Sequence, residues 1–502
     1  MCAASSRLSG HHRKKWRNLT RVQDLLRREL GGGKFRYRYV RHHLTHAAST
    51  FFASPYDEAA ILSVDAAGEW ATTMYARGQG NRIQILGEIP YPHSLGFAYG
   101  AITQHLGFRI CCDEGKVMGL APYGKPRHRE FFRRIIRFDK DQPIDSGKGL
   151  VLDLDYFQHH LGQQIYGSPK LTEALGPPRA ATDPLEDRHA DIAYGIQERC
   201  EEVMMQMSEK IKEVTKSDRL CLAGGVSLNS VANGKILERG PFQDVWAQPA
   251  ANDAGGALGA ALFVAHVVHD QPRRFVMEHA SFGPSFGDAE LAHAAKRSGL
   301  PHARRASIAR DVAKLIAAGK IVAWFQGRME WGPRALGNRS ILADPRRPDM
   351  KDVLNARVKH RESFRPFAPA VLQDRAADFF ASGYPSPFML LVSGVREARR
   401  SSVPAITHVD GTARVQTVTA EANPRFHELL REFDRLTGVP MLVNTSFNVM
   451  GQPIVCTPEQ AIECFNGTGI DALALGSFLL WKAGDDPLAV LGEGREVMAG
   501  EV

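Results

Sequence analysis

Two histidines near the start of the chain have the spacing of a metal-binding pair. His42 and His46 lie four residues apart in a helix-favouring stretch, so both imidazoles would project from one helical face. On its own such a pair more often reflects composition than ligation. Two acidic residues strengthen the case, because Asp65 ends an apolar, strand-like run and Asp253 precedes a Gly/Ala-rich helical stretch. Two imidazoles and two carboxylates would suit a divalent ion such as iron, manganese or zinc.

A glycine-rich turn follows a second strand-like run, at residues 220–223. Gly224 and Gly225 would let a ligand approach the backbone closely, and Asn229 adds a polar side chain a few residues later. Turns of this kind are common, so alone they are weak indications of a site. The stretch 114–124 mixes a Glu/Lys pair with turn residues, and it is equally compatible with a solvated loop.

The second half of the chain concentrates cations in turn-rich segments, followed by short polar side chains at the end of a strand-like run. Arginine binds oxyanions bidentately, while Asn, Ser and Thr orient neutral groups, so this combination is typical of a site for phosphates. The alternative is a set of basic surface loops paired with Glu330 and Glu362. The cations are Arg328, Arg334, Arg339, Lys359, Arg361 and Arg365, and the polar residues are Asn444, Thr445, Ser446 and Asn448.

The elements that must position these residues alternate between strands and helices. Strand-like runs at 59–65 and 220–223 flank a long helical pattern at 189–215, which predicts an α/β fold. The Pro-containing segment 271–307 reads as a passage between two cores, after which a new strand pattern starts at 320–325.

Composition excludes several classes of protein. The 502 residues are 44% hydrophobic and 24% charged, which is enough for two or three cored domains and excludes collagenous, disordered and disulfide-stapled chains. Seven cysteines without a Cys-x-x-Cys pair favour a reducing, cytoplasmic location. Neither a signal peptide nor a transmembrane helix is predicted, so we expect no membrane association.

The formal net charge of +8 allows nucleic acid as a partner without demanding it. Basic residues crowd the segment 11–41, where a helical pattern ends at three glycines, 31–33. We expect a solvated helix and linker there, with a nucleic-acid-binding arm as the alternative.

Several of these segments, taken in order, resemble the O-carbamoyltransferase family that includes the nodulation-factor, cephem and tobramycin enzymes. The resemblance implies that the first domain is similar to the Kae1 branch of the actin-like ATPase fold. It also implies that His42, His46, Asp65 and Asp253 hold a metal, with iron as the expected ion, where an acceptor hydroxyl is carbamoylated. The matching segments are 42–49, 64–70, 94–96, 114–124 and 224–229.

The second half resembles the family's YrdC-like domain. Its Lys-x-Arg and Ser-x-Asn motifs are matched by Lys359, Arg361, Ser446 and Asn448. The resemblance implies that this domain converts carbamoyl phosphate and ATP, with Mg²⁺, into carbamoyladenylate, which the first domain then uses. We expect Lys359, Arg361, Arg328 and Arg334 to act in catalysis, the last two as phosphate contacts. The expected nucleotide or substrate contacts are Arg339, Arg365, Asn444, Thr445, Ser446, Asn448, Gly224, Gly225 and Asn229.

The resulting hypothesis is an ATP-dependent O-carbamoyltransferase of secondary metabolism, acting on a hydroxyl of a small molecule or sugar. Alternatives are formation of threonylcarbamoyladenosine on tRNA and a non-catalytic module that binds a nucleotide or a partner. A homodimer is the default expectation, and nucleic acid is not expected as a partner. The expected boundaries are a basic segment at 1–38, a Kae1-like domain at 39–272, a connecting region at 273–305 and a YrdC-like domain at 306–502.

The resemblance covers roughly residues 39–490, because the strand hairpin with a His-Asp-Ser-Ala stretch that usually opens the family has no counterpart in this chain. Either the true start lies upstream or part of the first sheet has been lost. With a real loss we expect an unpaired edge strand in the first domain and the absence of the usual catalytic base. Glu69, His93 and His105 are candidate replacements among which the sequence does not choose.

Overall fold

The computed structural model describes residues 21–162, 164–484 and 487–492. The chain divides into two compact units, Met1–Arg41 and His42–Val502. In the first unit, helix α2 (Val22–Glu29) is followed by a turn through the three glycines, as the apolar spacing predicts. The part of the basic segment before residue 21 lies outside the described residues.

The first sheet of the second unit has five strands in the order β3-β2-β1-β6-β7. Strand β1 is antiparallel to β2 but parallel to β6, and β6 is parallel to β7. The carboxyl ends of β1 and β6 therefore meet at one edge of the sheet, where α/β proteins place their sites. The strands are β1 (Glu58–Gly68), β2 (Ala71–Gln79), β3 (Arg82–Pro90), β6 (Arg219–Ala223) and β7 (Asp244–Trp246).

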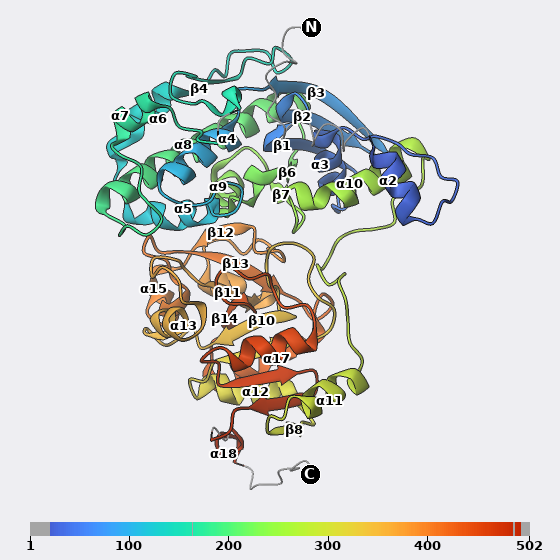
Figure 1. The fold of residues 1–502 in the computed structure, drawn as a ribbon, viewed down its shortest axis with the longest axis vertical. Helices are drawn as coiled ribbons and strands as arrows, with labels where there is room; N and C mark the ends of the chain where they lie inside the picture. The colour runs from blue at the N-terminus through green and yellow to red at the C-terminus, as the bar shows by residue number, and fades with distance from the viewer. Residues whose placement is uncertain (1–20, 163, 485–486, 493–502) are drawn as a thin grey trace. The chain divides into compact units, whose positions relative to one another are not determined.

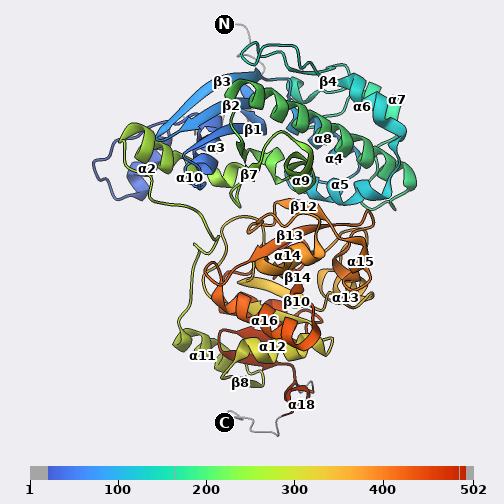
Figure 2. The ribbon, with the colours of Figure 1, turned by 180° about the vertical axis from the view of Figure 1, so that it is seen from behind.

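Helices cover both faces of this sheet. Alternate residues of β1 point to opposite faces, so Ile61 packs against α3 (His42–Phe51), whereas Leu62 packs with α4 (Leu95–His105) and α8 (Asp187–Thr215). Figure 1 shows α10 (Gly256–Phe263) beside α3, and Figure 2 shows α8 and α4 from the other side. The remaining elements of this half are α5 (Glu114–Leu120), α6 (Arg129–Ile135), α7 (Pro169–Leu175), α9 (Ser230–Arg239), β4 (Ile136–Phe138) and β5 (Leu150–Leu152).

The second sheet has nine strands in the order β12-β13-β11-β14-β10-β9-β15-β16-β8. Its strands are β8 (His302–Arg304), β9 (Val322–Phe325), β10 (Arg339–Ala343), β11 (Ala368–Leu372), β12 (Leu391–Gly394), β13 (Thr412–Val418), β14 (Met441–Ser446), β15 (Ala472–Leu475) and β16 (Phe478–Trp481). The helices are α11 (Asp288–Arg297), α12 (Ile308–Ala317), α13 (Met350–Leu354), α14 (Ala376–Phe379), α15 (Glu397–Arg400), α16 (Pro424–Thr437), α17 (Pro458–Asn466) and α18 (Leu488–Leu491).

The two sheets confirm the predicted α/β class. The expected strands at 59–65, 220–223 and 320–325 correspond to β1, β6 and β9, and the expected helix at 189–215 to α8. Within the expected connecting region, α11 and β8 belong to the second core: Leu291 is buried there and β8 pairs with β16. The extended stretch before α11 is thus the part that passes between the sheets.

The edges of the first sheet are β3 and β7. Strand β3 pairs with β2, and no described strand pairs with its other edge. The Ile144 carbonyl oxygen lies close to Gly87 at the position where a Cβ would point, so it approaches a face of the sheet. Among the described residues, no helix is both long enough and apolar enough to cross a bilayer.

Candidate active site: a metal cluster and an arginine-lined cavity

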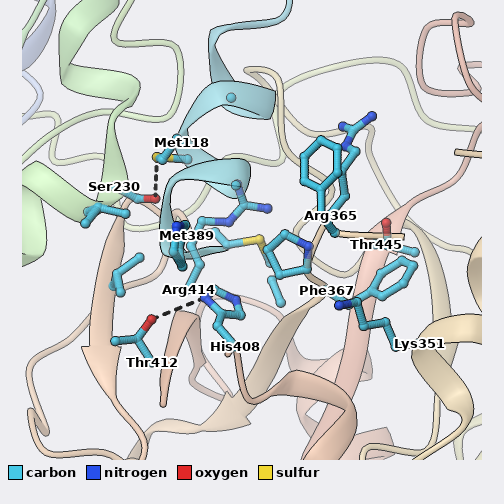
Figure 3. A pocket seen from close by; sticks show the side chains of 18 of the residues that line it. Met118, Ser230, Lys351, Arg365, Phe367, Met389, His408, Thr412, Arg414 and Thr445 are labelled. Atoms are coloured by element: carbon cyan, nitrogen blue, oxygen red, sulfur yellow. Dashed lines mark hydrogen bonds between the residues drawn. The ribbon is translucent and has the colours of Figure 1, made fainter. Parts of the chain in front are cut away.

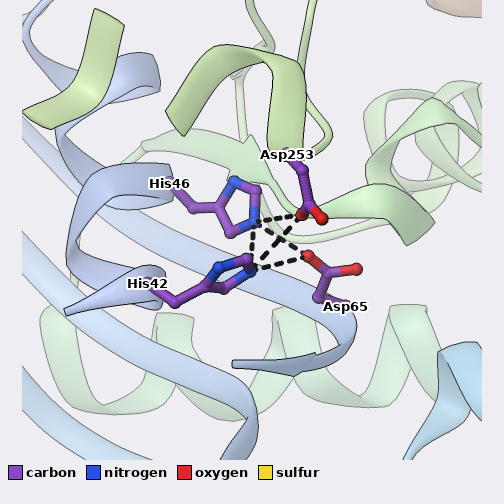
Figure 4. Close-up of side chains that lie close together, drawn as sticks. All are labelled: His42, His46, Asp65 and Asp253. Atoms are coloured by element: carbon purple, nitrogen blue, oxygen red, sulfur yellow. Dashed lines mark hydrogen bonds and ion pairs between the residues drawn. The ribbon is translucent and has the colours of Figure 1, made fainter. Parts of the chain in front are cut away.

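The four predicted metal ligands converge (Figure 4). One ligand atom from each of His42, His46, Asp65 and Asp253 lies within 4.8 Å of the others. Nε2 of His46 is 2.8 Å from Oδ2 of Asp65, and Nε2 of His42 is 3.2 Å from the same oxygen. Oδ1 of Asp253 is 3.5 Å from both imidazoles. This is the donor set that the sequence indicates.

Three elements bring the ligands together. Helix α3 carries both histidines, β1 carries Asp65 at an irregularity between Val64 and Gly68, and Asp253 opens a short 3₁₀ turn before α10. The backbone N–H of Ala66 donates to Oδ1 of Asp65 over 2.7 Å, which leaves the other carboxylate oxygen for the imidazoles. The ligands are thus held by segments that also form the core.

Glycines permit this close assembly. A side chain at Gly68 would collide with the His42 ring, and one at Gly96 would lie 2.8 Å from the Asp65 backbone. Gly225 lies against Oδ1 of Asp65, where a Cβ would be 3.0 Å away. The predicted glycine turn after β6 therefore supports the cluster by allowing close contact with Asp65.

The third histidine of the same helix has a different role. His43 Nδ1 is 2.8 Å from the Ser63 hydroxyl, and its Nε2 is 3.1 Å from the Ala71 carbonyl oxygen. Burial is the main cause that lowers the pKa of His43 to about 4, so it stays neutral at ordinary pH. His43 therefore anchors α3 to the sheet while His42 and His46 face the cluster.

The donor chemistry fits a divalent cation. The two Nε2 atoms are 2.9 Å apart, an arrangement that needs either a shared proton or a cation between lone pairs. Burial lowers the pKa of His46, but its contacts with Asp253 and Asp65 outweigh burial and raise it to about 9. Burial likewise opposes ionisation of Asp65, whereas the two histidines hold its pKa well below the usual range. The Asp253 side chain is 76% exposed, so the cluster opens to solvent on one side.

A second site is a cavity of about 260 Å³ lined from both sheet-containing halves of the 42–502 unit. From the first half come α5 and the start of α9, and from the second come the loops and strands around β11, β13 and β14. Figure 3 shows Met118 and Ser230 on one side and Arg414, His408 and Thr445 on the other. The lining includes Arg334, Arg361, Arg365, Arg414, Lys351, His408, Asn444, Thr445 and Ser446.

Four guanidinium groups dominate the charge of this cavity. Among the described residues, the guanidinium groups of Arg334 and Arg414 have no hydrogen-bonding or ion-pair partner. Burial and the neighbouring arginines lower the pKa of Arg414, and burial and Arg365 lower that of Arg361 to about 9 and that of Arg334 to about 10. All four remain charged at neutral pH, so the cavity is suited to a polyanion.

The Lys-x-Arg and Ser-x-Asn motifs meet as the family resemblance implies. Lys359 lies on a π-helical turn, Asn355–Lys359, and its Nζ donates to the Ser446 carbonyl oxygen and, over 2.9 Å, to Oδ1 of Asn448. Arg361 lies over the Phe367 ring at 4.5 Å and points into the cavity lining. Burial lowers the pKa of Lys359 strongly, with the arginines adding to this effect.

Three other predicted site residues do not line the arginine cavity. Arg328 is exposed and donates to the Gly283 carbonyl oxygen over 3.0 Å. Arg339 is fully buried, stacks on Phe325 and donates to the carbonyl oxygen of Gln326 over 2.6 Å. Asn229 caps α9 by accepting from Ala232 N–H. None of these three is among the residues that line the arginine cavity described here.

The alternative of surface loops paired with Glu330 and Glu362 holds only in part. Glu362 pairs with Arg365 at 3.8 Å and with Lys116 at 3.2 Å. Within the described chain Glu330 forms no ion pair, and its carboxylate binds backbone N–H groups instead. The arginines are therefore not neutralised as a surface set would be.

Sequence reasoning missed Arg414 and His408. Arg414 lies on β13 between the buried apolar residues Ala413 and Val415, and a cation at such a position could have been noticed. His408 Nδ1 is 3.2 Å from the Thr412 hydroxyl, and burial is the main cause that lowers the pKa of His408 to about 4. Only the folded chain shows that both face the arginine cavity.

The three candidate bases lie in different surroundings. Glu69 accepts the backbone N–H of His42 over 3.1 Å, which places it beside the cluster. His93 accepts Leu152 N–H through Nδ1, and His105 is buried among Arg188 and His189, with burial as the main cause that lowers its pKa to about 4. Glu69 is thus the candidate with a direct contact to a ligand residue.

Helix α5 contributes three residues to the arginine cavity, namely Gly115, Met118 and Gly119. Just before this helix, burial is the main cause that raises the pKa of the Cys111 thiol, and the carboxylates of Glu114, Asp65 and Asp253 add to it.

Comparisons with known proteins identify the family of this chain. The family descriptions "Carbamoyltransferase N-terminus" and "Carbamoyltransferase C-terminus" match residues 23–262 and 313–482. An uncharacterized protein of Synechocystis is 44% identical over 88% of this chain and 76% of its own length. Nodulation protein NolNO of Sinorhizobium fredii is 39% identical over 93% of this chain and 67% of its own.

A solved structure, HypF of T. kodakarensis, overlaps with a TM-score of 0.26 and 13% identity, covering 50% of this chain and 40% of that one, which is too weak to bear on the fold. The two family descriptions together span the cluster, the lining of the arginine cavity and every strand of the two sheets except β8. The chain therefore belongs to the carbamoyltransferase family.

Proposed function

We propose that this carbamoyltransferase is ATP-dependent and that it divides its reaction between the two sites. The arginine cavity converts carbamoyl phosphate and ATP into carbamoyladenylate, and the metal cluster transfers the carbamoyl group to a hydroxyl of a small-molecule or sugar acceptor. The observation that carries the proposal is the presence in one unit of a cavity lined by four arginines, of which Arg334 and Arg414 have no partner among the described residues, and of a converging two-histidine, two-aspartate cluster.

In the arginine cavity, the chain supplies charge and orientation. Water hydrolyses carbamoyl phosphate to carbamate and phosphate, and a carbamate oxygen then attacks the α-phosphorus of ATP, which releases pyrophosphate and leaves carbamoyladenylate. Carbamate is a poor acyl donor, whereas the mixed anhydride carries AMP as a good leaving group. The guanidinium groups of Arg334, Arg361 and Arg414 bind the phosphoryl oxygens and stabilise the negative charge that develops on them. Mg²⁺ bound with ATP would neutralise further phosphate charge.

Lys359 acts mainly by holding neighbouring groups. Its ammonium group is buried against Ser446 and Asn448, which fixes the end of β14 at the cavity. Thr445 and Ser446 then present hydroxyl groups to the ligand, as the cavity lining allows. These neutral donors suit the carbamoyl amide and carbonyl, which carry no full charge.

At the cluster, the chain holds the acceptor close to its ligands. The exposed Asp253 leaves one side of the cluster open, where an acceptor hydroxyl can enter. A divalent ion held by His42, His46, Asp65 and Asp253, with iron expected from the family resemblance, would lower the pKa of that hydroxyl or polarise the carbamoyl oxygen. Glu69 is placed beside His42 to accept the hydroxyl proton.

The test is the first half-reaction in isolation. The purified chain is incubated with Mg-ATP and carbamoyl phosphate without any acceptor, and carbamoyladenylate and pyrophosphate are measured by mass spectrometry. The proposal expects both products to appear together, and to require carbamoyl phosphate. ATP hydrolysis without the adenylate, or no turnover in protein that binds both substrates, would contradict it.

A further inference from the structure

The loop between β9 and β10 carries Arg334 to the cavity. It turns sharply at Gly332 and Gly337, whose φ angles of 101° and 105° are open to glycine but strained for other residues. A side chain at Gly337 would also collide with the Phe426 ring. The loop is therefore held in one conformation by its own sequence and by its neighbours.

One buried carboxylate holds the N–H groups of this loop. Glu330 is 7% exposed, and its Oε1 accepts from Leu336 N–H over 2.8 Å, Asn338 N–H over 2.7 Å and Arg339 N–H over 3.1 Å. Its Oε2 is buried and has no hydrogen-bond partner among the described residues. A single oxygen thus closes the turn that follows Arg334.

Other side chains hold the carbonyl groups of the same loop. Asn444 Nδ2 donates to the Ala335 carbonyl oxygen over 3.2 Å, and Gln416 Nε2 donates to that of Leu336 over 2.8 Å. The Trp324 indole N–H donates to Gly337 over 2.9 Å. The backbone that follows Arg334 is thereby fixed, whereas the Arg334 guanidinium has no partner among the described residues.

Glu330 does not act on Arg334 as a counter-ion. The charge of Glu330 acts on Arg339, whose guanidinium is occupied by backbone carbonyl groups, while the neighbouring charge that acts on Arg334 is that of Arg365. Arg334 therefore keeps its full positive charge for a ligand. The carboxylate influences Arg334 through the shape of the loop.

We propose that Glu330 is a positioning residue for anion binding: its carboxylate fixes the loop so that Arg334 points at a phosphoryl group of the substrate. The inference rests on the proposed function, because it assumes that the arginine cavity binds ATP or carbamoyl phosphate. A charged acceptor binds three N–H groups more strongly than a neutral acceptor does. An ionised carboxylate is therefore well suited to fix the backbone of this loop. An arginine that is already oriented loses less conformational freedom when the anion binds.

The test compares Glu330→Gln, Arg334→Gln and the double variant by ATP–pyrophosphate exchange in the presence of carbamoyl phosphate. Each single variant is expected to raise KM for at least one of the two anionic substrates roughly tenfold, with a smaller effect on kcat. The KM of the double variant is expected to be no more than about twofold above that of the single variant with the higher KM, because both changes remove the same interaction.

Two further variants keep the test informative. Gln416→Met removes one of the carbonyl contacts and is expected to raise the same KM by a smaller factor. Asp344→Asn is a matched control, since Asp344 is also buried in this half and accepts the backbone N–H of Arg346, but lies outside the cavity lining. It is expected to lower the melting temperature without changing KM.

The outcomes distinguish failure of the positioning role of Glu330 from failure of the proposed anion-binding site. Multiplicative effects of Glu330→Gln and Arg334→Gln, or a normal KM for Glu330→Gln and Gln416→Met in folded protein, would overturn the positioning role. A normal KM for Arg334→Gln itself would instead count against the arginine cavity as the site of anion binding.

Discussion

The metal cluster and the arginine cavity are suited to ions of opposite charge, and they are built from different parts of the chain. In the cluster, imidazole nitrogens lie 2.8–3.5 Å from carboxylate oxygens, an arrangement that can bind a cation. In the cavity, four half-buried arginines lie together, and Arg334 and Arg414 have no neutralising partner among the described residues, so an anion would be bound there. The cluster can form from a short helix and two sheet-edge turns, whereas the cavity needs both halves of the chain. The comparison teaches that local spacing can specify a cation site, but that an anion site of this kind depends on long-range packing.

The largest expected effect separates the two sites. Replacing His46 with Ala removes a fully buried ligand and should abolish tight metal binding and carbamoyl transfer, while carbamoyladenylate formation continues near the wild-type rate. Metal analysis and the two half-reactions measured side by side check this. A parallel His43→Gln variant should keep the metal but lose stability. Equal loss of both half-reactions in His46→Ala would break the division between the sites.

The reciprocal change acts on the arginine cavity. Replacing Arg361 with Ala should slow adenylate formation about 100-fold, because a positioned cation at a developing phosphoryl charge is lost. Metal content should be unchanged. Arg361→Lys should recover only part of the activity, since lysine cannot reproduce the planar, two-pronged donor. Full activity in Arg361→Lys would argue that charge alone matters there.

The pH dependence of binding should also differ between the sites. In the metal-free protein the pKa of His46 is raised to about 9, so below that pH an incoming ion must displace its proton. Apparent metal affinity should therefore rise with pH, by up to about tenfold per unit for one displaced proton, between pH 6 and pH 8. The arginines keep their charge over this range.

Titration calorimetry in buffers of different protonation enthalpy checks the proton release, with ATP binding as the internal comparison. A metal affinity that stays constant from pH 6 to pH 8 would contradict the expected protonation of His46.

The smallest expected effect tests which arginines belong to the cavity. Arg365 lines it, whereas Arg328 is exposed and bonded to backbone carbonyl groups. Arg365→Gln should raise KM for the anionic substrates severalfold, and Arg328→Gln should change it by less than about twofold. Steady-state kinetics of both variants decide this. A larger rise in KM for Arg328→Gln than for Arg365→Gln would indicate that the anion binds near the loop at Gly283.

The sequence by itself determined the elements and the chemistry of the cluster. Alternating strand and helix patterns predicted the α/β class, and β1, β6 and α8 lie where those patterns are strongest. The four-residue spacing of His42 and His46 sets them on one face of α3, because helical periodicity is local. Asp65 and Asp253 were predictable because both follow the rule that sites form at the carboxyl edge of a sheet.

The tertiary structure decided which cations act together. Arg328, Arg334 and Arg339 occur within twelve residues, yet one is exposed, one faces the arginine cavity and one is buried against backbone carbonyls. Arg414 on β13 comes near Arg334, in the loop before β10, through the pairing of β13 with β11, of β11 with β14 and of β14 with β10. Side-chain direction at such positions is set by strand register and loop closure between distant segments, which sequence spacing does not encode.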